Sequence, residues 1–231
     1  MNESKQLPSR PNRSVPGGHA RHDIPDPSET PDTVERLLDA GRTLFAKRGF
    51  EGASVRSLAS AAGANLGAVT YHFETKEALY HAVLGRVFGP VRDRVASLAR
   101  APLPAPQRLE KFVRVMFQQQ QANDDLPRFM AQEIVLGETP SPQVLETVRI
   151  VVGSLSQIMK EGQEAGTVVP GDPVLMALTL LSQPIYLSLM PRFLKRDDLR
   201  AAELPQPRDS AENHVLALLR NAFFVSQEES E

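Results

Sequence analysis

The chain has 231 residues, of which 41% are apolar and 23% charged, a composition that is ordinary for a globular protein with a buried core. Its formal net charge is -2 with a pI near 6.2, so affinity for a nucleic acid would need a local basic patch. The absence of cysteine excludes disulfides, thiolate metal sites and a cysteine nucleophile.

Sequence signals of an enzyme are missing as well. There is no glycine-rich phosphate loop and no paired-histidine metal motif, and of the five histidines only His19 and His22 are close in sequence. We therefore expect neither an enzyme nor a bound metal or cofactor. The N-terminus lacks the apolar core of a secretory signal, and residues 174–190 favour a buried helix over a membrane span because Gln183 and Pro184 interrupt a barely sufficient length. A cytoplasmic protein is expected.

Residues 1–30 hold five of the 19 prolines and almost nothing to bury, which predicts a disordered N-terminal extension. Arg10, Arg13 and Arg21 could form an arm that reaches into a DNA minor groove. The alternative is a solvated tail without a role.

A first helix is expected to begin at Asp32, whose side chain can cap it together with Glu35. Apolar residues then recur on one face over more than three turns. Gly41 lies where a second helix could cross closely, and Gly49 is placed to end the helix.

Residues 55–76 read as two short helices joined by a tight turn. Two apolar sets repeat with helical spacing, Val55, Leu58, Ala59 and Ala62 in the first and Leu66, Val69 and Phe73 in the second. Ala59 permits close contact with Val69, and Gly63 can adopt the left-handed conformation of a short turn. This spacing is typical of a helix-turn-helix, with a generic helical hairpin as the alternative.

The outward face of the second short helix contains no acidic residue. Its members are Asn65, Gly67, Ala68, Thr70, Tyr71 and His72. Residues 33–90 contain seven basic and five acidic residues, a balance of +2 that is opposite in sign to the whole chain. Small and hydrogen-bonding side chains without carboxylates suit a helix that enters the major groove.

The complete pattern resembles a known family. Residues 33–84 are similar, without a gap, to the N-terminal DNA-binding domain of the TetR/AcrR transcriptional regulators. The matching residues are Leu44, Phe45, Gly49, Phe50, Ser54, Tyr71, His72, Phe73, Lys76, Glu77 and Leu79. The resemblance implies phosphate contacts by Ser54, Tyr71, His72 and Lys76. It implies base reading from Arg56, Asn65, Gly67, Ala68 and Thr70.

The remaining chain shows helical periodicity and no strand signal. Residues 101–106 read as a stiff linker, and helices are expected near 108–121, 126–136 and 142–166. Pro173 opens a further helix that Pro184 should kink, residues 195–210 form a loop, and Ser210 caps a final helix. We predict an all-α protein with a disordered extension (1–30), a three-helix helix-turn-helix domain (31–84) and a helical ligand-binding and dimerisation domain (85–231).

Residues 174–194 are apolar on nearly all sides, which suits a helix that packs on its own domain and on a partner. TetR-like proteins dimerise through their last two helices, so the resemblance implies a four-helix bundle across a two-fold axis. The alternative is a helix buried entirely within a monomer.

The resemblance also implies a small-molecule site in the C-terminal domain. Residues 129–142 and 180–194 are loosely similar to the CecR subgroup, from which no ligand is inferred. Candidate apolar walls are Phe112, Met116, Phe129, Met130, Leu155, Met159 and Met176. Candidate polar contacts are Gln119, Glu133, Gln183 and Tyr186, and for each of these residues an ordinary core or surface position is the alternative.

The leading interpretation is a dimeric transcriptional regulator that binds palindromic operator DNA and is a repressor released by a small-molecule effector. The alternative is a helical small-molecule-binding or adaptor protein without sequence-specific DNA binding. The absence of acidic residues from the outward face of the second short helix in the helix-turn-helix favours the interpretation as a DNA-binding regulator.

Overall fold

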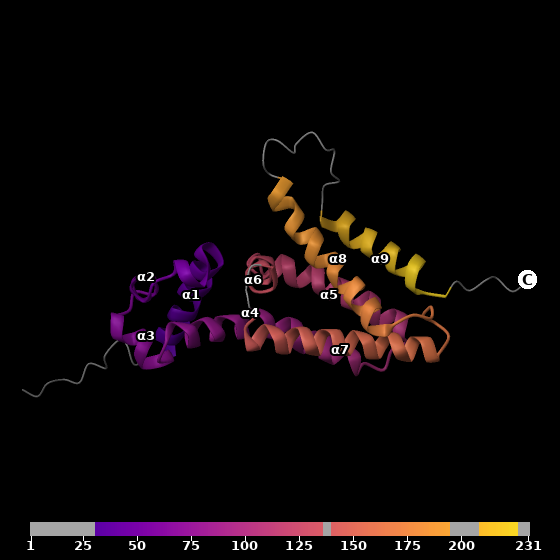
Figure 1. Cartoon of the computed structure of the whole chain (residues 1–231), viewed down its shortest axis with the longest axis horizontal. Helices are drawn as coiled ribbons and strands as arrows, with labels where there is room; N and C mark the ends of the chain where they lie inside the picture. The colour runs from indigo at the N-terminus through magenta and orange to yellow at the C-terminus, as the bar shows by residue number, and fades with distance from the viewer. Residues whose placement is uncertain (1–30, 136–139, 195–207, 226–231) are drawn as a thin grey trace, which may run out of the picture.

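The computed structural model describes residues 31–135, 140–194 and 208–225 (Figure 1). The predicted disordered extension, its three arginines and most of the expected loop at 195–210 lie outside these residues. Within the described chain, no helix is long and apolar enough to cross a membrane.

The architecture is all-α, as predicted. In chain order the helices are α1 (Pro31–Gly52), α2 (Val55–Ala61), α3 (Leu66–Phe73), α4 (Lys76–Ala99), α5 (Ala105–Ala122), α6 (Leu126–Met130), the π-helix η2 (Ala131–Val135), α7 (Pro142–Glu164), α8 (Pro173–Leu194) and α9 (Arg208–Phe223). In the described residues, the one β-type pairing outside helices is an isolated bridge between Val168 and Phe224.

Figure 1 shows α1, α2 and α3 gathered at one end of the molecule, with α4 running from them along the body beside α5 and α7. Helix α4 has 24 residues and is therefore about 36 Å long. The predicted domain boundary at residue 84 falls inside this helix, so one rigid element packs in both halves. Helices α8 and α9 lie above α4 and α7 in this view, away from the end of the molecule that holds α1, α2 and α3.

Local chemistry explains most of the helix ends at the N-terminal end of the molecule. Gly49 interrupts α1 with a φ of 72°, and Gly63 turns the chain between α2 and α3 with a φ of 61°. A Cβ on Gly41 would lie 3.1 Å from Cγ2 of Val83, which confirms the predicted close crossing of α1 by α4. The predicted cap at Ser210 is wrong: α9 already begins at Arg208, which leaves Ser210 in its first turn.

Helices α5 and α9 are joined by a two-pronged ion pair. Arg220 donates from Nε to Glu110 Oε1 at 2.7 Å and from Nη2 to Glu110 Oε2 at 3.0 Å. The hydrogen bond from Arg220 lowers the pKa of the Glu110 carboxyl, and the positive charges of Arg220 and Arg114 add to this effect.

A pKa lowered by folding stabilises the protein above the unfolded-state pKa, and this contribution is lost as the pH falls through the folded-state value. Arg220→Gln should therefore lower the free energy of unfolding by about 0.5 to 1 kcal/mol at pH 7 and by much less at pH 3. Urea unfolding at both pH values measures the difference. Lys160→Gln, which removes an exposed 4.0 Å pair with Glu164, is the control and should change little. An equal loss at both pH values would contradict the prediction.

Candidate functional site

The helix-turn-helix is built by capping residues that the chain supplies at each helix start. Ser54 Oγ accepts a hydrogen bond from the Ser57 amide at 3.2 Å at the start of α2. Asn65 Oδ1 accepts one from the Ala68 amide at 2.8 Å at the start of α3. Both capping residues are exposed. The second helix of the motif is thus held in place by the Asn65 cap, which the sequence analysis did not predict, and Ala59 and Val69 are buried as predicted.

Six of the nine predicted DNA contacts are exposed on this unit, namely Ser54, Arg56, Asn65, Gly67, Thr70 and Tyr71. His72 and Lys76 are half-buried beside them. Tyr71 is 67% exposed, and its ring meets the His72 ring edge-on with centroids 4.9 Å apart. The exposed side of α3 therefore presents polar and small residues without a carboxylate, together with Leu66, which is 53% exposed although its spacing predicted an inward position.

Ala68 is the exception, and its placement on the outward face was wrong. Its side chain is fully buried together with that of Val69. At 100° per residue these neighbours share the inward side of a short helix, which turns Gly67 and Thr70 outward instead. Ala68 thus packs α3 onto the domain and does not reach a base.

Lys76 has an intramolecular role that sequence reasoning missed. Its Nζ donates to the Phe50 carbonyl at 3.0 Å and lies 4.0 Å from the centroid of the Phe50 ring. Neither the carbonyl nor the ring carries a net charge, so these two contacts do not form an ion pair at the start of α4. The sequence signal was Phe50 itself, placed after the glycine that ends the regular part of α1.

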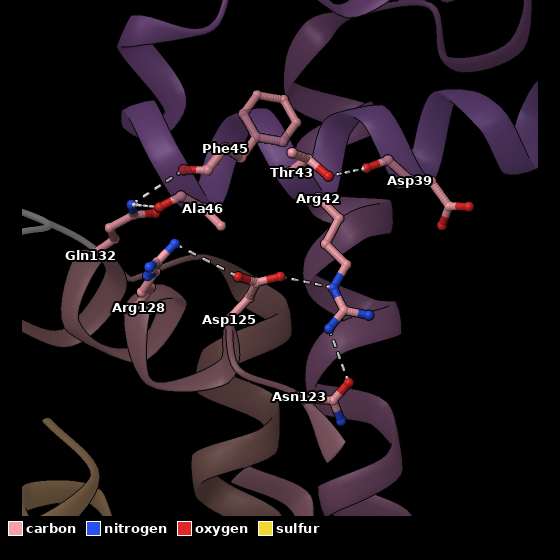
Figure 2. Close-up of polar contacts among 9 residues, drawn as sticks. All are labelled: Asp39, Arg42, Thr43, Phe45, Ala46, Asn123, Asp125, Arg128 and Gln132. Atoms are coloured by element: carbon pink, nitrogen blue, oxygen red, sulfur yellow. Dashed lines mark hydrogen bonds and ion pairs between the residues drawn. The ribbon is translucent and has the colours of Figure 1, made fainter. Parts of the chain in front are cut away.

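A second group of polar contacts joins the α5 to η2 segment to helix α1 (Figure 2). Arg42 of α1 donates from Nε to Asp125 Oδ2 at 3.2 Å and from Nη2 to Asn123 Oδ1 at 3.0 Å. Gln132 of η2 donates from Nε2 to the carbonyls of Phe45 at 3.2 Å and Ala46 at 3.4 Å. We call these contacts the α1 contact group.

Helix α4 is held by the same segment. The Tyr80 hydroxyl donates to Glu133 Oε1 at 2.6 Å, and the Ser141 amide donates to Glu133 Oε2 at 2.7 Å, with all three residues buried. Burial, and then the hydrogen bond to the Glu133 carboxylate and its charge, raise the pKa of Tyr80 above its ordinary range. Glu133 was predicted to contact a ligand, but the structure engages both of its oxygens within the protein.

Tyr80→Phe should lower the free energy of unfolding by about 1 to 3 kcal/mol, because it leaves a buried carboxylate oxygen without its donor. Chemical denaturation at neutral pH measures this loss. Tyr71→Phe removes the hydroxyl of a ring that is 67% exposed and, in the absence of DNA, should change stability by less than about 0.5 kcal/mol. Equal effects of the two variants would show that the Tyr80 hydrogen bond contributes nothing net.

An apolar cavity of about 40 Å³ lies between helices α4, α5, α6, α7 and α8. It is lined by Phe88, Val91, Met116, Gln120, Leu126, Pro127, Met130, Val144, Thr147, Val148, Val151, Leu181, Ile185 and Ser188. We call it the effector cavity, after the role that is proposed for it below.

Of the predicted ligand contacts, the structure brings only Met116 and Met130 to the effector cavity. Five residues are buried in the core without lining it, namely Phe112, Gln119, Phe129, Leu155 and Met159. Met176 packs beside Gly171, Gln183 is half-buried on α8, and Tyr186 is exposed. Periodicity identifies the inward faces of helices, but it does not show where the packed faces leave a cavity between them.

No group of three or more histidine or acidic side chains capable of holding a metal occurs in the described residues. The observed elements instead define a class of protein: a helix-turn-helix DNA-binding unit carried on a larger helical body.

Comparison with known proteins shows which family the N-terminal unit resembles. Residues 37–83 match the sequence profile of the bacterial regulatory proteins of the tetR family. The HTH-type transcriptional repressor DhaR of Mycobacterium sp. (strain GP1) is 26% identical over 136 residues, which cover 58% of this chain and 69% of DhaR. The repressor KstR2 of Rhodococcus jostii (strain RHA1) is 42% identical over 65 residues, which cover 26% of this chain and 32% of KstR2.

Solved structures share the whole fold. A tetR-family regulatory protein from Rhodococcus RHA1 superposes with a TM-score of 0.67 at 23% identity, covering 85% of this chain and all of that one. SmeT, the repressor of a Stenotrophomonas maltophilia multidrug efflux pump, gives a TM-score of 0.65 at 18% identity over 85% of this chain and 94% of SmeT. Residues 37–83 thus correspond to the DNA-binding domain of the tetR-family regulators, and together the comparisons support a DNA-binding transcriptional regulator of the TetR/AcrR type, as the resemblance in the sequence indicated.

Proposed function

We propose that the protein is a homodimeric repressor that binds a palindromic operator and leaves it when a small molecule occupies the effector cavity. The observation that carries the DNA-binding part is the exposed, carboxylate-free outward face of α3. The relatives DhaR and KstR2 are repressors, which supports the direction of regulation. The proposal makes the protein a regulator without catalytic activity, acting in the cytoplasm with the DNA.

Contacts to DNA are proposed to divide by chemistry. Ser54, Tyr71, His72 and Lys76 donate hydrogen bonds or charge to phosphates, which sets affinity and position. Arg56, Asn65, Gly67 and Thr70 face the base edges, where donors, acceptors and close approach carry sequence information.

A second copy of the chain is the proposed partner of α8 and α9. Both helices leave large apolar side chains exposed in the single chain: Leu175 at 63%, Leu178 at 44% and Tyr186 at 60% on α8, and Leu218 at 37% on α9, with Val225 at 45% just after the end of α9. Single exposed apolar residues are normal, but two adjacent helices that expose them together mark an interface. A two-fold axis at this interface would provide two copies of α3, one for each half-site of a palindrome.

Ligand binding in the cavity is proposed to release the protein from DNA by moving helix α6 and the π-helix η2. Leu126, Pro127 and Met130 line the cavity, while Asp125 and Gln132 directly beside them belong to the α1 contact group. A ligand that widens the cavity would displace this segment and with it α1. The two DNA-binding units would then lose the separation of roughly one helical turn that a palindrome requires.

Selection of bound sequences from a random DNA pool, followed by affinity measurements against salt concentration, tests the proposal. A palindrome and a steep salt dependence are expected. Thr70→Ala should change the preferred sequence, with the salt slope unchanged. Binding that is equal for all sequences would refute sequence-specific regulation and favour the helical adaptor or small-molecule-binding alternative.

A further inference from the structure

The absence of charge from the described wall of the effector cavity restricts the ligands that it can bind. None of the described residues that line it is acidic, basic or histidine. A carboxylate or ammonium group entering such a wall would leave its hydration shell without gaining an opposite charge. Charged effectors are therefore selected against by the lining itself.

The polar groups in the lining narrow the chemistry further. Gln120 Nε2 already donates to the Pro184 carbonyl at 3.0 Å, Thr147 Oγ1 to the Gln143 carbonyl at 2.8 Å, and Ser188 Oγ to the Ile185 carbonyl at 2.7 Å. Both hydroxyl protons and one of the two amide protons of Gln120 are thus used within the protein. Polar atoms contribute almost nothing to the wall of the cavity, which is therefore apolar as well as uncharged.

We infer that the effector is an uncharged, predominantly apolar molecule with few polar atoms. This inference rests on the proposed function, because it assigns the chemistry of the same cavity. Apolar walls supply affinity by removing the apolar surface of the ligand from water.

The cavity must widen to admit such a ligand, since about 40 Å³ holds little more than a few water-sized groups. Met116 and Met130 are the adaptable parts of the wall, because an unbranched thioether can take many rotamers at low cost. Met130 ends α6, so its movement is coupled to the segment that holds α1.

Three probes that share an aliphatic chain and differ in the charge of the head group test the inference: decanol, decanoate and decyltrimethylammonium. Their affinities for the full-length protein without DNA are measured by titration calorimetry, with thermal shift as a second readout. Decanol should bind at least about tenfold more tightly than either ion. Val148→Phe, which fills the cavity, should weaken decanol binding, whereas Leu145→Phe on the exposed face of the same helix should not.

Thr147→Lys introduces a cation into the wall and should reverse the order, so that decanoate binds more tightly than decanol. If this variant does not fold, Ser188→Lys places the same charge on α8. Equal or tighter binding of either ion by the unmodified protein would overturn the inference, as would failure of decanol to bind. Neither outcome affects operator selection, so the inference can fail while the proposed DNA-binding function stands.

Discussion

Tyr71→Ala is expected to weaken binding to the selected operator by roughly 30- to 100-fold. Each lost hydrogen bond to a phosphate contributes about 1 to 1.5 kcal/mol, and a palindrome engages two protomers. Because the ring is 67% exposed, the free energy of unfolding should change by less than about 0.5 kcal/mol. Fluorescence anisotropy with labelled operator measures the affinity.

Two further variants separate the hydroxyl from the ring. Tyr71→Phe should reproduce most of the loss if the hydroxyl donates to a phosphate, and the loss should be similar for all sequences. Leu145→Ala, at a residue that is 50% exposed on α7, should leave DNA binding unchanged. A Tyr71→Ala variant that binds as tightly as the unmodified protein would remove Tyr71 from the interface.

Leu178→Arg is expected to convert the dimer to a monomer and to lower operator affinity by more than about 100-fold. Two arginines related by the two-fold axis would meet in an apolar contact without a partner, and burial of an unpaired charge costs several kcal/mol. Light scattering coupled to size exclusion measures the mass, and anisotropy measures the affinity at the same concentration.

Leu145→Arg is the matched control, because it places the same charge on an apolar residue that is 50% exposed on α7. It should leave both mass and affinity unchanged. Leu218→Arg on α9 should behave like Leu178→Arg. Dimers that survive both the α8 and the α9 variants would show that the copies meet through another surface.

The helix-turn-helix could be predicted because its signals are local. A capping serine or asparagine, a glycine at a positive φ and apolar residues three or four apart act within one or two helical turns. Ser54, Gly63 and Val69 each occupy the place that their own chemistry requires. Ala68 was misplaced because a small side chain fits both faces of a short helix, and only its neighbours decide.

The cavity could not be predicted at the level of residues. Gln120 and Thr147 look like ordinary polar positions in the sequence, yet both lie in its wall. Their neighbours there come from five helices that are far apart in the chain. Glu133 shows the converse: the sequence offered it as a polar ligand contact, and in the structure a tyrosine 53 positions away donates a hydrogen bond to it instead.

The sequence by itself therefore determined the all-α class, the DNA-binding unit and the position of most helices, because these depend on propensity, capping and periodicity along a short stretch of chain. The tertiary structure alone decided where the packed helices leave a cavity, which polar groups are already hydrogen-bonded, and which residues of the segment after α5 form hydrogen bonds with α1. Those properties depend on the distances between distant segments, and no local pattern encodes them.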